Sequence, residues 1–126
     1  KHATLQGSLL GTGFPFRDQK DWLELYLDIF TDFTKIVGAI RRPGSAALDL
    51  AYVASGRYDG FWEFGLKSWD VAAGVLLIQE AGGIVQNIIP DTDPVESGSL
   101  FCGNPKIFEG MQEIIHPYDK RLKAFA

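Results

Sequence analysis

Two acidic residues, Glu63 and Asp70, are placed where their carboxylates could do chemistry. Glu63 lies near the end of a predicted strand, and Asp70 lies at the start of the next predicted helix. Both side chains can face one cleft across the loop at Gly65. Paired carboxylates can hold a hard cation such as Mg²⁺, or one can bind the cation while the other accepts hydrogen bonds from substrate hydroxyls. A helix cap at Asp70 and a solvated strand end at Glu63 are the structural alternatives.

Two predicted helices begin with small side chains. One start is formed by Gly44, Ser45, Ala46 and Ala47, and the other runs over residues 69–74. Small residues leave the first backbone N–H groups open to a ligand, and a helix N-terminus attracts phosphate through these unpaired donors. An N-cap role for Ser45 and close helix–sheet packing for residues 72–74 are the alternatives. The Gly-x-Gly sequence at 11–13 is only a weak indication of a phosphate loop.

Strands and helices alternate along the chain. The patterns predict strands at residues 4–10, 36–40, 57–64, 84–89 and 99–102, and helices at 19–35, 45–54, 69–81 and 105–115. The strand at 36–40 is expected to be buried, and residues 90–98 to be a polar loop. Such alternation implies an α/β fold in which helices flank a layered sheet, with the loops that enter helices gathered at one edge. No linker interrupts the pattern, so residues 1–126 are expected to form a single domain.

The composition narrows the classes of partner. The chain has 126 residues, of which 46% are hydrophobic, and a net charge of −4. This acidic balance argues against direct nucleic-acid binding, which needs a basic face. The single cysteine excludes an internal disulfide and suits a cytoplasmic protein. No apolar run approaches the ~20 residues of a membrane span, so we expect no membrane partner.

The residues around Asp70 form a longer motif. It reads Trp69-Asp70-Val71-Ala72-Ala73-Gly74-Val75-Leu76-Leu77-Ile78, followed by Glu80-Ala81-Gly82-Gly83. This motif resembles the C-terminal signature of inositol monophosphatases. The similarity extends outward through residues 44–54 and 56–63, and residues 11–16 resemble the bacterial members. It covers roughly residues 5–115.

The resemblance implies a lithium-inhibited, Mg²⁺-dependent phosphomonoesterase acting on inositol 1-phosphate, and a cytoplasmic homodimer. By position, Asp70 resembles a metal ligand that also approaches the substrate, and Glu63 resembles the acceptor for inositol ring hydroxyls. Gly44, Ser45 and Ala46 resemble the helix start that lines the substrate. The implied fold is the C-terminal half of an α-β-α-β-α sandwich.

The sequence departs from the family in one respect. The Glu and the Asp-Pro-x-Asp-Gly-Thr motif that supply the family's other metal ligands are absent. We therefore expect the chain to be the C-terminal half of a longer protein, and to hydrolyse nothing at a useful rate alone. A protein-binding role in transcription complexes is the alternative from another class. Fructose bisphosphate, histidinol phosphate and nucleotide 3′-phosphates are the alternative substrates.

Overall fold

The computed structural model describes residues 5–13, 20–41, 46–66 and 68–125. The elements, in chain order, are β1 (Leu9–Thr12), α1 (Lys20–Thr34), β2 (Ala39–Arg41), α2 (Ala46–Ala54), β3 (Gly60–Glu63), α3 (Ser68–Glu80), β4 (Ile84–Asn87), α4 (Pro94–Ser97), β5 (Leu100–Gly103), α5 (Pro105–Ile115), η1 (His116–Tyr118), α6 (Asp119–Leu122) and η2 (Lys123–Phe125). None of the described helices is long and apolar enough to cross a membrane.

The strands form one mixed sheet in the order β2-β1-β3-β5-β4. β1 is parallel to both β2 and β3, whereas β5 is antiparallel to both β3 and β4. The carboxyl ends of β1, β2 and β3 therefore share one edge of the sheet. The α/β architecture expected from the alternating pattern is confirmed.

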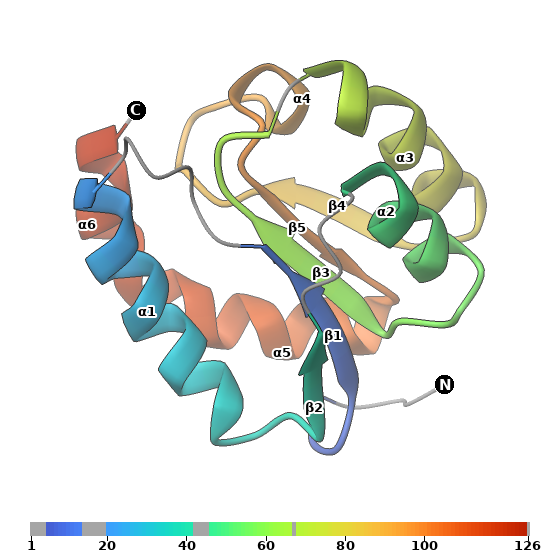
Figure 1. The fold of residues 1–126 in the computed structure, drawn as a ribbon, viewed down its shortest axis with the longest axis horizontal. Helices are drawn as coiled ribbons and strands as arrows, with labels where there is room; N and C mark the ends of the chain where they lie inside the picture. The colour runs from blue at the N-terminus through green and yellow to red at the C-terminus, as the bar shows by residue number, and fades with distance from the viewer. Residues whose placement is uncertain (1–4, 14–19, 42–45, 67, 126) are drawn as a thin grey trace.

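Helices cover both faces of this sheet. Figure 1 shows α1 and α5 on one side and α2 and α3 on the other. Side chains alternate along a strand, and on β3 Trp62 packs in the core on the α1–α5 side while Phe61 packs in the core under α2 and α3. The Trp62 ring stacks on Phe33 of α1 with 4.4 Å between ring centroids. The fold thus has three layers and two apolar cores.

Helices α2 and α3 approach each other closely at Gly74. A Cβ atom added to Gly74 would lie 2.6 Å from Cβ of Leu50 on α2. Ala72 and Ala73 are exposed on the same helix. Gly74 therefore serves close packing of α3 on α2, whereas the sequence had suggested helix–sheet packing for residues 72–74.

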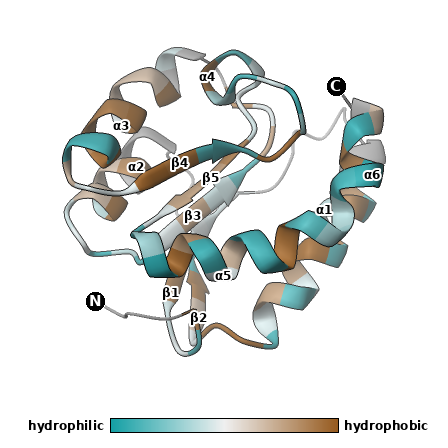
Figure 2. Ribbon diagram, turned by 180° about the vertical axis from the view of Figure 1, so that it is seen from behind, coloured by the Kyte–Doolittle hydropathy of each residue, from teal (hydrophilic) through white to brown (hydrophobic). Residues whose placement is uncertain are grey.

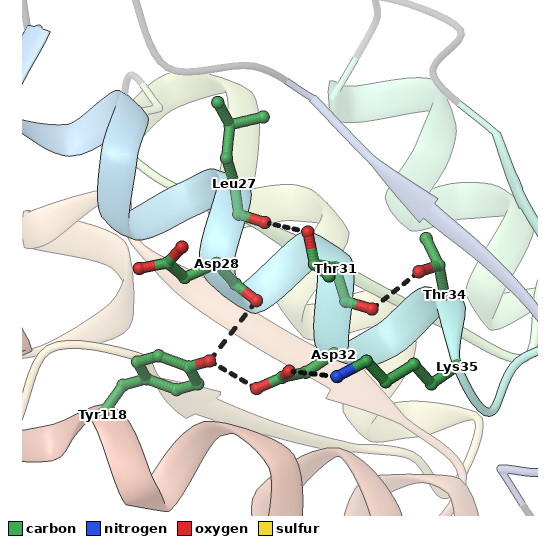
Figure 3. Close-up of polar contacts among 7 residues, drawn as sticks. All are labelled: Leu27, Asp28, Thr31, Asp32, Thr34, Lys35 and Tyr118. Carbon is green, nitrogen blue, oxygen red and sulfur yellow. Dashed lines mark hydrogen bonds and ion pairs between the residues drawn. The ribbon is translucent and has the colours of Figure 1, made fainter.

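The end of the chain is tied to α1 by polar contacts. The Tyr118 hydroxyl donates to the Asp32 carboxylate and lies 3.3 Å from the Asp28 carbonyl oxygen, as Figure 3 shows. Arg121 of α6 donates to the Asp28 carboxylate at 2.8 Å. Partial burial and the hydrogen bond to Asp32 raise the pKa of Tyr118 to about 12, helped by the negative charges of Asp32 and Asp28 and opposed by Arg121.

The structure corrects three details of the predicted elements. The strand expected to be buried at 36–40 is β2, which lies at the sheet edge with Ala39 and Arg41 exposed, because among the described strands it pairs with β1 alone. The expected loop at 90–98 contains α4, whose first N–H groups are capped by Asp93. The first strand begins at Leu9 rather than residue 4, because the chain turns at Leu5, where Ser8 N–H donates to the Leu5 carbonyl.

Candidate functional site

Glu63 lies against the backbone of Gly13 at the shared edge of the sheet. Glu63 is the last residue of β3 and is half-buried, and Gly13 directly follows β1. A Cβ atom on Gly13 would lie 2.3 Å from Oε1 of Glu63 and 2.9 Å from Oε2. No side chain at position 13 could therefore coexist with this position of the carboxylate. The second glycine of the Gly-x-Gly sequence makes room for Glu63, a role that the sequence reading missed.

Thr12 fixes the end of β1 beside the end of β3. Its hydroxyl donates to the carbonyl oxygen of Trp62 at 2.8 Å and lies 3.1 Å from the hydroxyl of Tyr26. Because the Thr12 hydroxyl has one proton, Tyr26 must donate in the second contact. All three residues are buried. This network holds Gly13 next to Glu63 and was not foreseen from the sequence.

The turn between β3 and α3 is anchored by a second segment. The N–H of Gly65 donates to the hydroxyl of buried Ser99 at 3.0 Å, and the N–H of Leu66 donates to the carbonyl of Gly98 at 2.9 Å. Gly98 has a φ of 69°, and a Cβ there would lie 1.9 Å from the Leu66 carbonyl oxygen. These contacts set where α3 begins relative to Glu63. Their one sequence signal is the Ser-Gly-Ser sequence at 97–99.

The helix starts lie at the same edge as Glu63. α2 begins at Ala46 after β2, and α3 begins at Ser68 after β3, which places Asp70 in its first turn. Two helix N-termini, each carrying partial positive charge, therefore follow strands whose carboxyl ends share an edge. Gly44 and Ser45 lie outside the described residues, as do the side chains of Ala46 and Asp70. That Glu63 and Asp70 face one cleft stays a prediction.

The described residues do not by themselves make a metal centre. Among them, no group of three or more His, Cys, Asp or Glu side chains is placed to hold a metal ion. Mg²⁺ requires near-octahedral oxygen coordination, to which Glu63 could add one carboxylate. A magnesium site would need further ligands from outside these residues.

Cys102 offers no alternative chemistry. It is buried in β5, and this burial raises the pKa of its thiol far above its usual range, despite a hydrogen bond with the backbone of Phe61. A buried, protonated thiol is inert as a nucleophile. Chemistry at the described edge thus rests on Glu63 and the two helix starts.

Comparisons with known proteins place this arrangement in a family. The family model described as the inositol monophosphatase family matches residues 1–120. Nus factor SuhB of Pseudomonas aeruginosa is 53% identical over 116 residues, which are 91% of this chain and 43% of that protein.

Solved structures of similar proteins share the fold of this chain. The extragenic suppressor protein suhB of Bartonella henselae has a TM-score of 0.83 and 37% identity, covering 91% of this chain and 43% of that chain. The inositol monophosphatase of Anabaena has a TM-score of 0.81 and 37% identity, covering 93% of this chain and 46% of that chain. The chain spans less than half the length of these relatives. With the same layered sheet and a family match over nearly all its residues, the chain belongs to the inositol monophosphatase family.

Proposed function

We propose that this chain is part of a Mg²⁺-dependent phosphomonoesterase that hydrolyses inositol 1-phosphate. The observation that carries the proposal is the Glu63 carboxylate, held against Gly13 at the edge where α2 and α3 begin. A carboxylate accepts hydrogen bonds from hydroxyls, and helix N-termini bind phosphate. This edge therefore offers one partner to the ring hydroxyls of inositol phosphate and another to its phosphate group. The similarity to the Anabaena inositol monophosphatase supports the same reading.

Each candidate residue has a role in this proposal. Glu63 accepts hydrogen bonds from ring hydroxyls, and Gly44, Ser45 and Ala46 offer backbone N–H groups to the substrate. Asp70 is one ligand of Mg²⁺ and approaches the phosphate. The remaining ligands come from sequence of the longer relatives that this chain does not contain.

Substitutions in the full-length protein test these roles. Asp70→Asn should lower kcat for inositol 1-phosphate by about 100-fold or more, because a carboxylate metal ligand is lost.

Glu63→Gln should raise KM for inositol 1-phosphate by about tenfold, the usual effect of losing a charge-assisted hydrogen bond. The KM for 4-nitrophenyl phosphate, which has no ring hydroxyls, should stay unchanged in Glu63→Gln. Glu109→Gln, an exposed acid on α5, is the matched control. An equal rise of KM for both substrates would contradict the role of Glu63.

The substrate itself is tested with a panel of phosphate esters. The full-length protein should prefer inositol 1-phosphate over fructose bisphosphate, histidinol phosphate and nucleotide 3′-phosphates. Preference for a bisphosphorylated nucleotide would contradict the proposal.

A protein-binding role in transcription complexes is the second candidate. It is favoured by relatives named Nus factor SuhB in Pseudomonas aeruginosa and in Escherichia coli, the latter 47% identical over 107 residues. The Asp70→Asn variant separates the two functions, because it removes the proposed metal ligand and replaces it with a side chain of nearly the same size. If complex assembly is the function, the variant should lose hydrolysis and still bind its protein partners in a pull-down.

The proposal also includes a cytoplasmic homodimer. Sedimentation velocity of the full-length protein should give the mass of two chains. A monomer at micromolar concentration would contradict this part of the proposal.

A further inference from the structure

Glu63 is supported from the face of the sheet that its own side chain does not occupy. Side chains alternate along β3, so Glu63 lies on the same side as Phe61, under α2 and α3, and Trp62 lies on the other. Tyr26 of α1 packs on the side of Trp62. Its ring centroid lies 6.2 Å from that of Trp62, stacked at 26°, and 6.2 Å from that of Phe64, edge-on at 76°. The Tyr26 ring therefore packs on the residue before Glu63 and on the residue after it.

A chain of hydrogen bonds runs from the Tyr26 hydroxyl to the peptide group that precedes Glu63. Tyr26 donates to the Thr12 hydroxyl across 3.1 Å, and Thr12 donates to the Trp62 carbonyl oxygen at 2.8 Å. This carbonyl belongs to the planar peptide group that joins Trp62 to Glu63, so a bond that holds its oxygen also holds the plane from which the Glu63 backbone continues. The register of β1 and β3 ends at Thr12 and Trp62. The Thr12 bond therefore braces the strand pair directly before the carboxylate.

Stability alone does not explain two buried hydroxyls at this place. Tyr26 and Thr12 are both buried, beside an apolar core. A buried hydrogen bond gains little net free energy because it replaces bonds to water, and an apolar pair of the same shape can be nearly as stable. A satisfied polar network instead fixes one geometry of the groups that it joins. The group next to this network is the Glu63 carboxylate.

We propose that Tyr26 and Thr12 are positioning residues that determine how well Glu63 recognises the ring hydroxyls of the substrate. This inference rests on the proposed function, and it names what makes that function selective. Gly13 leaves the space that the carboxylate occupies, while Tyr26 and Thr12 hold the backbone of β3 from the opposite face. Both hydroxyls are buried on the α1 side, so neither touches the substrate. Their loss should affect substrates that carry ring hydroxyls and leave the phosphate chemistry unchanged.

Variants of the full-length protein that remove one hydroxyl and keep the shape test this role. Thr12→Val should raise KM for inositol 1-phosphate about fivefold, because the Trp62 carbonyl loses its hydroxyl donor. Tyr26→Phe keeps the ring on Trp62 and Phe64 and should raise this KM about twofold to threefold, because Thr12 keeps its own bond and loses only its donor. Thr12→Ser keeps the hydroxyl and should match the parent. The kcat for inositol 1-phosphate and the KM for 4-nitrophenyl phosphate should stay unchanged in all three variants.

A second set of measurements separates positioning from a general loosening of the fold. Added to Glu63→Gln, Thr12→Val should raise KM for inositol 1-phosphate little further, because the carboxylate that it positions is already gone. A loosened fold would raise this KM equally in both backgrounds. Tyr52→Phe, which removes a tyrosine hydroxyl from α2 while its ring still packs on Tyr58, is the matched control and should behave like the parent.

Glu63→Gln also separates a failure of this inference from a failure of the proposed function. If Glu63→Gln leaves KM for inositol 1-phosphate unchanged, the proposed role of Glu63 is wrong and this inference falls with it. If Glu63→Gln raises KM while Thr12→Val and Tyr26→Phe do not, only the positioning role is wrong. A rise of KM for both substrates alike, or an undiminished effect of Thr12→Val in the Glu63→Gln background, also overturns it. Should Thr12→Val fail to fold, the KM of Tyr26→Phe for the two substrates decides.

Discussion

At the scale of single residues, the contact between Gly13 and Glu63 carries the candidate site. The carboxylate occupies the space that a Cβ at position 13 would need. Gly13 directly follows β1 and Glu63 ends β3, and these two strands pair in the sheet although they lie far apart in the sequence. The position of Glu63 thus depends on the absence of a side chain on the neighbouring strand.

Gly13→Ala should displace the Glu63 carboxylate. With 2.3 Å between the new methyl and Oε1, the carboxylate must move, but it ends a flexible, half-buried side chain, so we expect the free energy of unfolding to fall by no more than about 1 kcal/mol. The KM for inositol 1-phosphate in the full-length protein should rise with it. Chemical denaturation and steady-state kinetics measure the two effects.

A double-mutant cycle isolates the cause. In the Glu63→Ala background, Gly13→Ala should cost much less stability, because the clashing carboxylate is gone. An equal cost in both backgrounds would mean that Gly13 matters for its backbone conformation and not for Glu63.

Tyr118 makes the stability of the folded chain depend on pH on the alkaline side. Its pKa is raised from 10 to about 12, which means that the folded state favours the neutral phenol. The stabilisation from this group is therefore fully present below pH 10 and is lost as the pH rises through about 12.

Tyr118→Phe should remove this part of the alkaline loss of stability. Below pH 10 the variant should be less stable by about 1 kcal/mol, since it lacks the hydrogen bond to Asp32. The difference from the parent should shrink toward pH 12 in denaturation experiments. Tyr52→Phe, whose ring still packs on Tyr58, is the control and should show no such convergence.

At the scale of elements, α3 carries apolar residues on both of its sides. Val71, Val75 and Ile78 are buried against the sheet, while Trp69, Leu76 and Leu77 are 75%, 56% and 46% exposed. Figure 2 shows this helix brown or pale over most of its length. A helix that is apolar all round is typical of one covered on two sides. In this chain the outward side of α3 is an exposed apolar surface.

Replacing the outward leucines of α3 should leave this chain folded and should lower its binding of hydrophobic compounds. Leu76→Lys combined with Leu77→Gln keeps good helix formers, so the unfolding free energy should change by less than about 0.5 kcal/mol. Binding of the dye ANS should fall. Ile78→Ala, on the inward side, should instead cost about 2–5 kcal/mol. A large loss of stability in the double variant would contradict the exposed position of these leucines.

At the scale of the whole molecule, this chain should not hydrolyse inositol 1-phosphate by itself. Its described residues gather no set of three metal-ligating side chains, and one or two carboxylates hold Mg²⁺ weakly without substrate phosphate. A phosphate-release assay with Mg²⁺ should show no turnover above the buffer. The full-length protein serves as the positive control. Mg²⁺-dependent turnover by the purified chain would refute this prediction.

Local patterns predicted much of the architecture. The helix at 105–115 is confirmed to the residue, because Asn104 caps it and Pro105 begins it. The edge position of β2 could not be predicted, because it depends on which strands pair, and pairing joins distant segments. The role of Gly13 could not be predicted either, because its contact with Glu63 also joins distant segments of the chain. Glu63 could be picked out as a strand-end carboxylate, whereas its support by Thr12, Gly98 and Ser99 could not.

The place of β5 in the sheet has a consequence for synthesis on the ribosome. β5 follows β4 in the chain, yet it lies between β3 and β4 in the sheet. As the chain emerges, β2, β1 and β3 can pair at once, but β4 has no partner in the sheet until Leu100–Gly103 leaves the exit tunnel. A nascent chain that stalls before Leu100 would present two open strand edges to other chains. The five-stranded sheet is therefore completed only after β5 has emerged, and a product that ends before Leu100 would be prone to aggregate.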